Sequence, residues 1–281
     1  MHINTPFLTA LFALSAAAAW GSGDFTGGLA ARRVGPFHTV LISYTIGLVA
    51  LTIIAIVIGE PFPSAGDMLW GAAAGLLGWV GLGFLLRGFS AGRMGIVAPV
   101  SASLATAIPV IFTALTQGLP DALRFIGFAL AIAGIWLLSR PEPLGGRPAG
   151  LGMALVAGIG FGGFFTALDQ VSEGALFWPL VAGRLACCLV MFTYAAAARR
   201  PVIPSRAPLG IIALAGILDV SGNLFFLLAV QAGRLDIATI LGSLYPAVTA
   251  ILAWLIAGER MARSQVFGVA TALAAIILIT I

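Results

Sequence analysis

The sequence predicts an all-α integral membrane protein of about ten transmembrane helices, built as two inverted five-helix repeats around a central cavity. Composition predicts the class, because 60% of the 281 residues are hydrophobic and only 9% are charged, whereas a water-soluble chain has ~25% charged residues. A repeat that spans half of the chain predicts the architecture. We therefore expect the lipid bilayer to surround most of the protein.

Apolar runs long enough to cross ~30 Å of hydrocarbon follow one another along the chain. In the first half we expect helices at 6–28, 36–58, 68–88, 95–117 and 122–139. In the second half we expect helices at 150–171, 175–197, 208–230, 237–258 and 264–281. Turn signals such as Gly35-Pro36 separate them. The Pro- and Gly-rich segment 140–149 predicts a linker between a first repeat at 1–139 and a second at 150–281.

The second half of the chain repeats the first at a shift of 141 residues, without a gap. Ala91-Gly92-Arg93 falls on Ala232-Gly233-Arg234, and Trp20-Gly21 falls on Phe161-Gly162. A duplicated unit explains these matches. Because each unit has an odd number of helices, the second must enter the membrane in the opposite direction to the first. In transporters built in this way, the ligand site lies between the repeats near the membrane midplane.

All 14 basic residues are Arg, and their placement predicts the orientation in the membrane. Odd-numbered expected loops contain eleven of them, whereas even-numbered loops contain only Arg124 and Arg234. Cytoplasmic loops are enriched in basic residues, so we expect both termini outside, in a multi-pass protein of a bacterial inner membrane. No basic run is interleaved with aromatic residues, so nothing indicates nucleic-acid binding.

The stretch from Ile237 to Glu259 carries a family resemblance. It is an apolar run that contains Leu244 and Pro246 and ends at Gly258-Glu259. This pattern resembles the end of an EamA domain, in the drug/metabolite transporter superfamily, and with the repeat the resemblance extends to nearly the whole chain. It implies a secondary transporter of a small metabolite, commonly an amino acid or another polar compound that moves outward. It also implies that both termini lie inside, in disagreement with the arginine placement, which we follow.

Two ionisable residues lie well inside apolar runs, where a charge costs several kcal/mol and indicates function. Asp219 lies near the middle of the helix expected at 208–230, and Asn223 is one turn further along the same face. Asp219 is a candidate cation partner or proton carrier; the alternative is a buried ion pair that only fixes helix contacts. Arg184 is a candidate partner for Asp219 or for a substrate carboxylate; the alternative is that it reaches to the membrane surface. If the two residues pair at rest, a zwitterionic substrate could exchange with both.

Trp20, Asp24 and Trp79 are further candidates for the cavity wall. Asp24 lies about 12 Å from the centre of the first apolar run at ~1.5 Å per residue, so it is either a cavity residue or a wetted residue at a helix end. Trp20 precedes it in the same run, beside a glycine cluster that either breaks the helix or lets another helix pack closely. Trp79 aligns with Val220, the neighbour of Asp219, and is expected to face the same cavity.

Three prolines lie inside expected membrane helices. Pro99 and Pro109 are in the helix at 95–117, and Pro246 is in its repeat counterpart at 237–258. Proline is tolerated in a membrane bundle because neighbouring groups satisfy the carbonyl that it frees. These prolines are candidate hinges for alternating access; the alternative is that they form static kinks.

Two other classes of function fit parts of the sequence. The segment 21–24 reads GSGD and fits the GxGD signature of intramembrane aspartyl proteases, with Asp24 and Asp219 as the paired acids, but that family's proline-alanine-leucine motif is absent near the C-terminus. A non-transporting membrane scaffold or sensor would bury the polar groups without a cavity. No cofactor or metal motif is present, and the adjacent Cys187 and Cys188 match neither a disulfide framework nor a metal site. We therefore predict a transporter with a small-molecule substrate, possible proton coupling and no cofactor, as a monomer or weak homodimer.

Overall fold

The computed structural model describes residues 5–91, 94–139, 150–199, 202, 204, 207–258 and 263–280, and within these residues the chain forms α-helices and no strand. The first half contains α1 (Thr5–Val34), α2 (Pro36–Ile58), α3 (Ala65–Ala91), α4 (Met94–Gln117) and α5 (Ala122–Ser139). The second half contains α6 (Leu151–Asp169), α7 (Phe177–Ala197), α8 (Leu209–Ala232), α9 (Leu235–Gly242), α10 (Tyr245–Ala257) and α11 (Arg263–Thr280). The expected linker 140–149, residue Glu259 and several of the loop arginines lie outside the described residues. The all-α class is confirmed.

The outside of the helix bundle is suited to lipid. Eight segments of the described chain are long and apolar enough to cross a membrane, with α9 and α10 together forming one of them. The shorter α5 and α11 have 18 residues each, or ~27 Å at ~1.5 Å per residue, close to the ~30 Å of the hydrocarbon core. Large apolar side chains such as Val57 and Leu115 are 78% and 82% exposed. The prediction of a multi-pass membrane protein is therefore confirmed.

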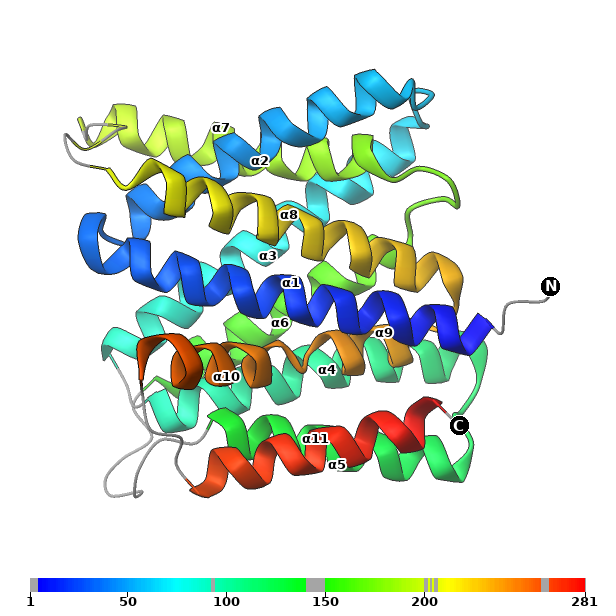
Figure 1. The fold of residues 1–281 in the computed structure, drawn as a ribbon. Helices are drawn as coiled ribbons and strands as arrows, with labels where there is room; N and C mark the ends of the chain where they lie inside the picture. Colours follow the sequence, from blue (N-terminus) through cyan, green and yellow to red (C-terminus); the bar gives the residue numbers. More distant parts are fainter. Residues whose placement is uncertain are drawn as a thin grey trace.

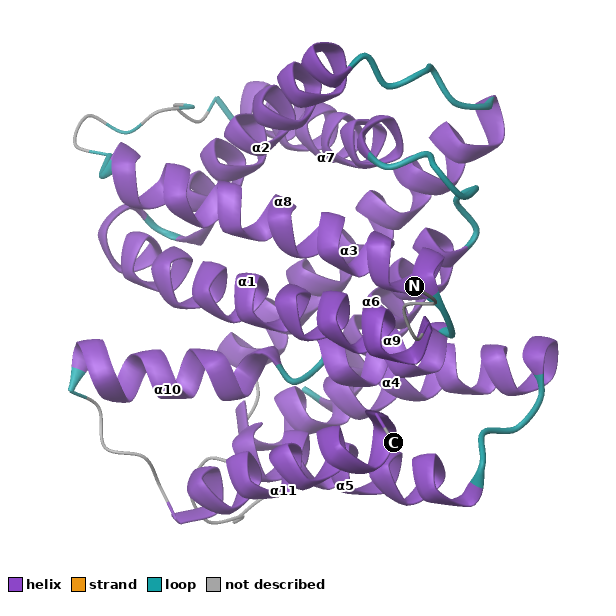
Figure 2. Ribbon diagram, turned by 45° about the vertical axis from the view of Figure 1, so that its right-hand side comes forward, coloured by secondary structure: helices purple, strands orange, loops and turns teal. Residues whose placement is uncertain are grey.

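The helices run side by side across Figure 1, and both termini lie at the same end of the bundle. We call this end the terminal face. The loops after α2, α4, α6 and α8 lie there, whereas the junction of α1 and α2 at Gly35 lies at the opposite face. Figure 2 shows that the loops gather at these two ends. Because each half crosses five times, α1 starts at the terminal face and α6 starts at the opposite face, so the two halves run in opposite directions.

Helix contacts in one half recur in the other with the partners exchanged. Helix α1 packs along α8, and its counterpart α6 packs along α3; likewise α2 contacts α8 and α7 contacts α3. The same relation holds for single residues. A Cβ added at Gly222 would collide with Trp20, and one added at Gly81 would crowd Phe161. The 141-residue shift relates Gly81 to Gly222 and Trp20 to Phe161, so the two contacts are equivalent. The predicted inverted repeat is confirmed.

Helix α1 is longer than expected, because it continues to Val34 rather than ending near residue 28. The glycine cluster after Trp20 does not break it. A Cβ added at Gly21 would lie 2.6 Å from Val248 Cβ on α10, so the missing side chain there allows close packing of two helices. A Cβ at Gly23 would lie at an ordinary contact distance of 3.5 Å from the Asp219 backbone nitrogen on α8. Asp24 therefore lies in the interior of α1 and close to α8.

The stretch expected as one helix at 237–258 is two helices. Helix α9 ends at Gly242, and α10 begins at Tyr245 after a short turn. Pro246 follows directly, within the first turn of α10, where its missing N–H is no loss and its fixed φ suits the start of a helix. Its repeat counterpart α4 is unbroken although it contains Pro99 and Pro109. The expectation of a single helix was therefore wrong at this position.

Candidate functional site

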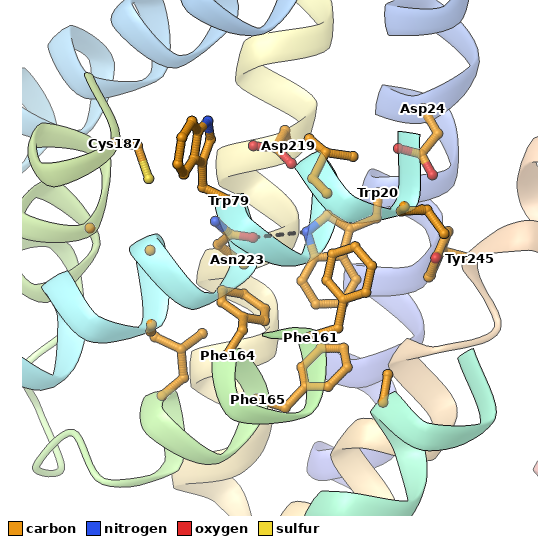
Figure 3. Close-up of a pocket in the computed structure, with 18 of the residues that line it drawn as sticks. Trp20, Asp24, Trp79, Phe161, Phe164, Phe165, Cys187, Asp219, Asn223 and Tyr245 are labelled. Atoms are coloured by element: carbon orange, nitrogen blue, oxygen red, sulfur yellow. Dashed lines mark hydrogen bonds between the residues drawn. The ribbon is translucent and has the colours of Figure 1, made fainter. Parts of the chain in front are cut away.

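A cavity of about 370 Å³ lies between the two repeats (Figure 3). Its wall is formed by residues of α1, α2, α3, α4, α6, α7, α8 and α10, so both repeats contribute. The volume is within the ~300–1,000 Å³ that is usual for small-molecule sites. A scaffold or sensor without a substrate was expected to pack this region closed, so the cavity favours a transporter.

An ion pair between α7 and α8 forms part of the cavity wall. Arg184 Nη2 donates a hydrogen bond to Asp219 Oδ2. The Arg184 guanidinium also lies over the ring of Tyr44 on α2, 4.1 Å from its centroid, which is a favourable cation–π contact. Arg184 is 5% exposed, so it does not extend to the membrane surface. The Asp219 side chain is 35% exposed, so removing Asp219 would leave the buried Arg184 guanidinium unpaired and destabilise the protein.

Trp20 of α1 and Asn223 of α8 meet beside the ion pair. Trp20 Nε1 donates a hydrogen bond of 2.9 Å to Asn223 Oδ1, drawn as a dashed line in Figure 3. In the described part of the chain, no residue accepts a hydrogen bond from the Asn223 amide nitrogen. The two N–H groups of this nitrogen are therefore available as donors at the wall of the cavity.

A second part of the cavity wall is aromatic. The Trp20 ring centroid lies 6.3 Å from that of Phe164, 6.0 Å from that of Phe165 and 6.5 Å from that of Tyr245. Phe161, the repeat counterpart of Trp20, lines the same space. Aromatic pairs at such distances pack favourably and hold each other in place. The cavity therefore offers a rigid apolar surface next to a polar one.

The polar and apolar parts of the wall come from equivalent positions in the two repeats. Under the 141-residue shift, Asp219 corresponds to Gly78 and Asp24 corresponds to Phe165, and all four line the cavity. The fold is thus nearly symmetric while the chemistry of its central cavity is not. An amphipathic solute, with charges at one end and an apolar group at the other, suits a wall of this kind.

Asp24 lies deeper in the membrane region than the sequence suggested. Helix α1 ends at Val34, ten residues after Asp24, or ~15 Å at ~1.5 Å per residue, so Asp24 is not at a helix end. It lines the cavity and is exposed. Within the described ranges it accepts no hydrogen bond and forms no ion pair. A protease would need Asp24 and Asp219 to share a proton, but Asp219 is paired with Arg184 instead.

Trp79 and Pro246 also line the cavity, from α3 and from the start of α10. Pro109 is buried in α4, and its carbonyl accepts a 2.8 Å hydrogen bond from Thr113 Oγ1. Pro99 lies in the same unbroken helix. A hinge role stays a prediction for all three prolines, and only Pro246 lies beside a helix interruption that supports it.

Sequence reasoning missed a carboxylate that joins the two repeats at the terminal face. Glu60, in the loop after α2, accepts hydrogen bonds of 2.6 to 3.0 Å from the backbone N–H groups of Leu176, Phe177 and Trp178. These are unsatisfied groups at the start of α7, where the helix dipole also favours a negative charge. We call this contact the Glu60 cap. Glu60 and Leu176 are 116 residues apart, so no local pattern could have revealed it.

Further hydrogen bonds tie the loop after α6 to its neighbours at the same face. Asp67 on α3 accepts a 2.8 Å bond from the backbone N–H of Ser172. Gln231, near the end of α8, donates bonds of 3.1 Å to the carbonyls of Ser172 and Ala175. The Asp67 bond and the Glu60 cap hold the two repeats together across the terminal face, and the Gln231 bonds fix the loop within the second repeat.

The model of the EamA-like transporter family matches residues 7–140 and, a second time, residues 148–281. A crystal structure of another protein has the same fold, with a TM-score of 0.77 and 16% sequence identity, over 96% of this chain and 95% of that one. None of the curated proteins matches the sequence.

Proposed function

The chain belongs to the EamA-like transporter family, and from this premise we propose that it is a secondary transporter and not an enzyme. Its substrate is a small polar or amphipathic, amino-acid-like metabolite, which it exports by alternating access. We place it in a bacterial inner membrane with both termini outside, because the arginines are concentrated in the odd-numbered loops.

The observation that carries this proposal is the Arg184–Asp219 ion pair on the wall of the cavity. An amino acid has both of the matching charges. Its carboxylate suits the planar guanidinium of Arg184, and its ammonium group suits the Asp219 carboxylate. Opening the pair without a replacement leaves the buried Arg184 guanidinium without a counter-charge, which is unfavourable. A zwitterion replaces both partners at once, so the pair can open for it.

The aromatic wall supports an apolar or amphipathic side chain on the substrate. Trp20, Phe161 and Phe164 line the cavity together with the ion pair. A substrate held by its charges at Arg184 and Asp219 would bury the rest of its surface against these rings. Burial of apolar surface contributes roughly 25 cal/mol per Å², and the rigid rings lose little side-chain freedom on binding. Solutes with several negative charges do not suit a cavity that has one guanidinium.

Alternating access requires that the terminal face open and close. The Glu60 cap joins the first repeat to the start of α7, and Asp67 joins α3 to the loop after α6. We infer that these bonds form the outer gate in its closed state, with the cavity ready to load from the cytoplasm. The turn between α9 and α10, next to Pro246, is a position at which the wall can bend during the exchange.

The test uses purified protein in proteoliposomes, with a panel of radiolabelled L-amino acids in a counterflow assay. Arg184→Gln and Asp219→Asn should each abolish transport. The double variant Arg184→Gln/Asp219→Asn leaves neither charge of the pair without its partner and should fold well, as measured by gel filtration and thermal unfolding. Arg124→Gln, at the start of α5 and away from the cavity, serves as the control and should transport normally.

The double variant separates a binding role from a structural one. If the ion pair binds the substrate, the double variant stays inactive although it is folded. If the pair only fixes helix contacts, removing both charges should restore transport. Transport by the double variant would therefore refute the proposal.

A further inference from the structure

We propose that the transported metabolite carries one net positive charge, and that its cationic group competes with a proton for Asp24. This inference rests on the proposed function, because it concerns the substrate of the same cavity. It adds the net charge of the substrate, the position at which the extra charge binds, and the ion that is exchanged for it.

The residues that line the cavity have one negative charge in excess. Asp24 and Asp219 are the acidic residues among the described lining residues, and Arg184 is the basic one. Arg184 and Asp219 neutralise each other through their ion pair. The excess charge therefore belongs to Asp24, which has neither an ion-pair partner nor a hydrogen-bond donor among the described residues.

No basic residue in the described part of a helix that packs against α1 serves as the ion-pair partner of Asp24. Helix α1 packs against α8, α9, α10 and α2 and touches α11. The charged and titratable residues on these helices are Asp219 on α8, Asp236 on α9, Tyr245 on α10, His38 and Tyr44 on α2, and Arg263 on α11. Asp236 is paired with Arg234 at the terminal face. His38 is two residues into α2, where its Nδ1 lies 3.0 Å from the Val34 carbonyl oxygen, and Arg263 is the first residue of α11.

Aromatic rings adjoin the Asp24 carboxylate. Trp20 lies one helical turn before Asp24 on α1, and Tyr245 approaches from the start of α10 (Figure 3). An ammonium group beside Asp24 would gain an ion pair with the carboxylate and favourable cation–π contacts with the rings. The geometry thus suits an organic cation as well as a proton.

The excess charge determines which states of the cavity, empty or loaded, can change between facing inward and facing outward. A cavity with an unpaired charge is unfavourable in the interior of a membrane. The empty cavity becomes neutral when Asp24 binds a proton. The loaded cavity becomes neutral when the substrate brings one net positive charge and the proton has left. Because one carboxylate cannot hold both, each substrate cation that crosses outward is exchanged for one proton that crosses inward.

A diamino acid has the groups that this arrangement requires. Its α-carboxylate binds Arg184, its α-ammonium group binds Asp219, and the ammonium group of its side chain binds Asp24. L-lysine and L-norleucine form a matched pair of probes, since they have the same carbon chain and differ only in the ε-ammonium group. Norleucine has no net charge, so it can use the Arg184–Asp219 pair but leaves the proton on Asp24.

Isothermal titration calorimetry of the detergent-solubilised protein tests this without a transport assay. We expect lysine to bind roughly tenfold or more tightly than norleucine, as one added charged contact predicts. Titration in two buffers with different ionisation enthalpies should show that lysine displaces about one proton and norleucine none. Lysine binding should weaken as the pH falls, because protons then occupy Asp24, while norleucine binding stays constant.

Asp24→Asn should abolish the preference for lysine and the proton release, while norleucine binding is kept. Asp24→Glu keeps the carboxylate, so it should retain the lysine preference and the proton release. Equal affinities of the wild type for the two compounds, or a lysine preference that survives in Asp24→Asn, would overturn the inference. If the inference fails in this way, the proposed function would still be supported when the wild type binds norleucine and Arg184→Gln/Asp219→Asn does not. If the wild type binds neither compound, the inference and the amino-acid proposal both fail.

Discussion

Weakening the Glu60 cap should open the terminal face. Glu60→Gln keeps the shape of the side chain and one acceptor oxygen but removes the charge that three backbone N–H groups share at the start of α7. A neutral hydrogen bond contributes ~0.5–1.5 kcal/mol and a charge-assisted one about twice as much, and a charge at a helix N-terminus adds ~0.3–1 kcal/mol. Part of each bond survives, so we expect the closed state to lose ~1–2 kcal/mol. This loss changes the ratio of open to closed protein by a factor of roughly 5–30.

The assay measures how fast a thiol reagent reaches the cavity from the terminal face. Leu180 is 5% exposed and lines the cavity near the start of α7, so Leu180→Cys reports on this route once the protein's two cysteines, Cys187 and Cys188, are replaced by Ala. With a membrane-impermeant maleimide, Glu60→Gln should raise the labelling rate about fivefold or more. Asp121→Asn removes a charge from the same face outside the cap and should leave the rate unchanged. An unchanged rate in Glu60→Gln would refute the reasoning.

Two further predictions concern packing and pH. Gly222→Ala should destabilise the protein by ~1–3 kcal/mol through overpacking, because the added Cβ collides with the Trp20 ring. Gly210→Ala on the same helix is the control, since its Cβ meets nothing within 4 Å. Equal melting temperatures for the two variants would contradict this prediction. The backbone N–H of Arg124 donates to Asp121 and holds the pKa of this carboxyl below its ordinary value of 3.8. The stability that Asp121 contributes is therefore complete above about pH 4 and is lost as the pH falls through the lower pKa of the folded state. Asp121→Asn should lower the melting temperature at about pH 7 and not at about pH 2; an equal shift at both would contradict the assignment.

The sequence was sufficient to predict the architecture because the duplication is visible in it. The shift that places Trp20 on Phe161 also places Gly222 on Gly81, and in the structure these residues form equivalent contacts in the two repeats. Hydrophobic run lengths defined most of the spans within a few residues. The cavity followed from the topology, since two units that run in opposite directions meet near the midplane.

The remaining features depend on contacts between distant parts of the chain. The glycines after Trp20 fit either a helix break or a close helix contact, and only the packing of α10 against Gly21 decides between the two. Pro246 and Pro109 look alike in sequence, yet one follows an interruption and the other lies within a continuous helix. Pro109 removes a hydrogen bond within α4, whereas Pro246 lies in the first turn of α10, where no helical bond is lost. Whether a helix breaks at a proline depends on the neighbours that satisfy the freed groups.

The chemistry of the site lies where the two repeats differ. A duplicated unit places its two copies of each position around one cavity, so identical residues would make that cavity nearly symmetric. Here Asp24 and Asp219 have Phe165 and Gly78 as their counterparts, and all of them line the cavity. A charge inside the membrane costs several kcal/mol and indicates function. Positions at which one copy is charged and the other is apolar are therefore the candidate binding residues that a comparison of the two copies provides.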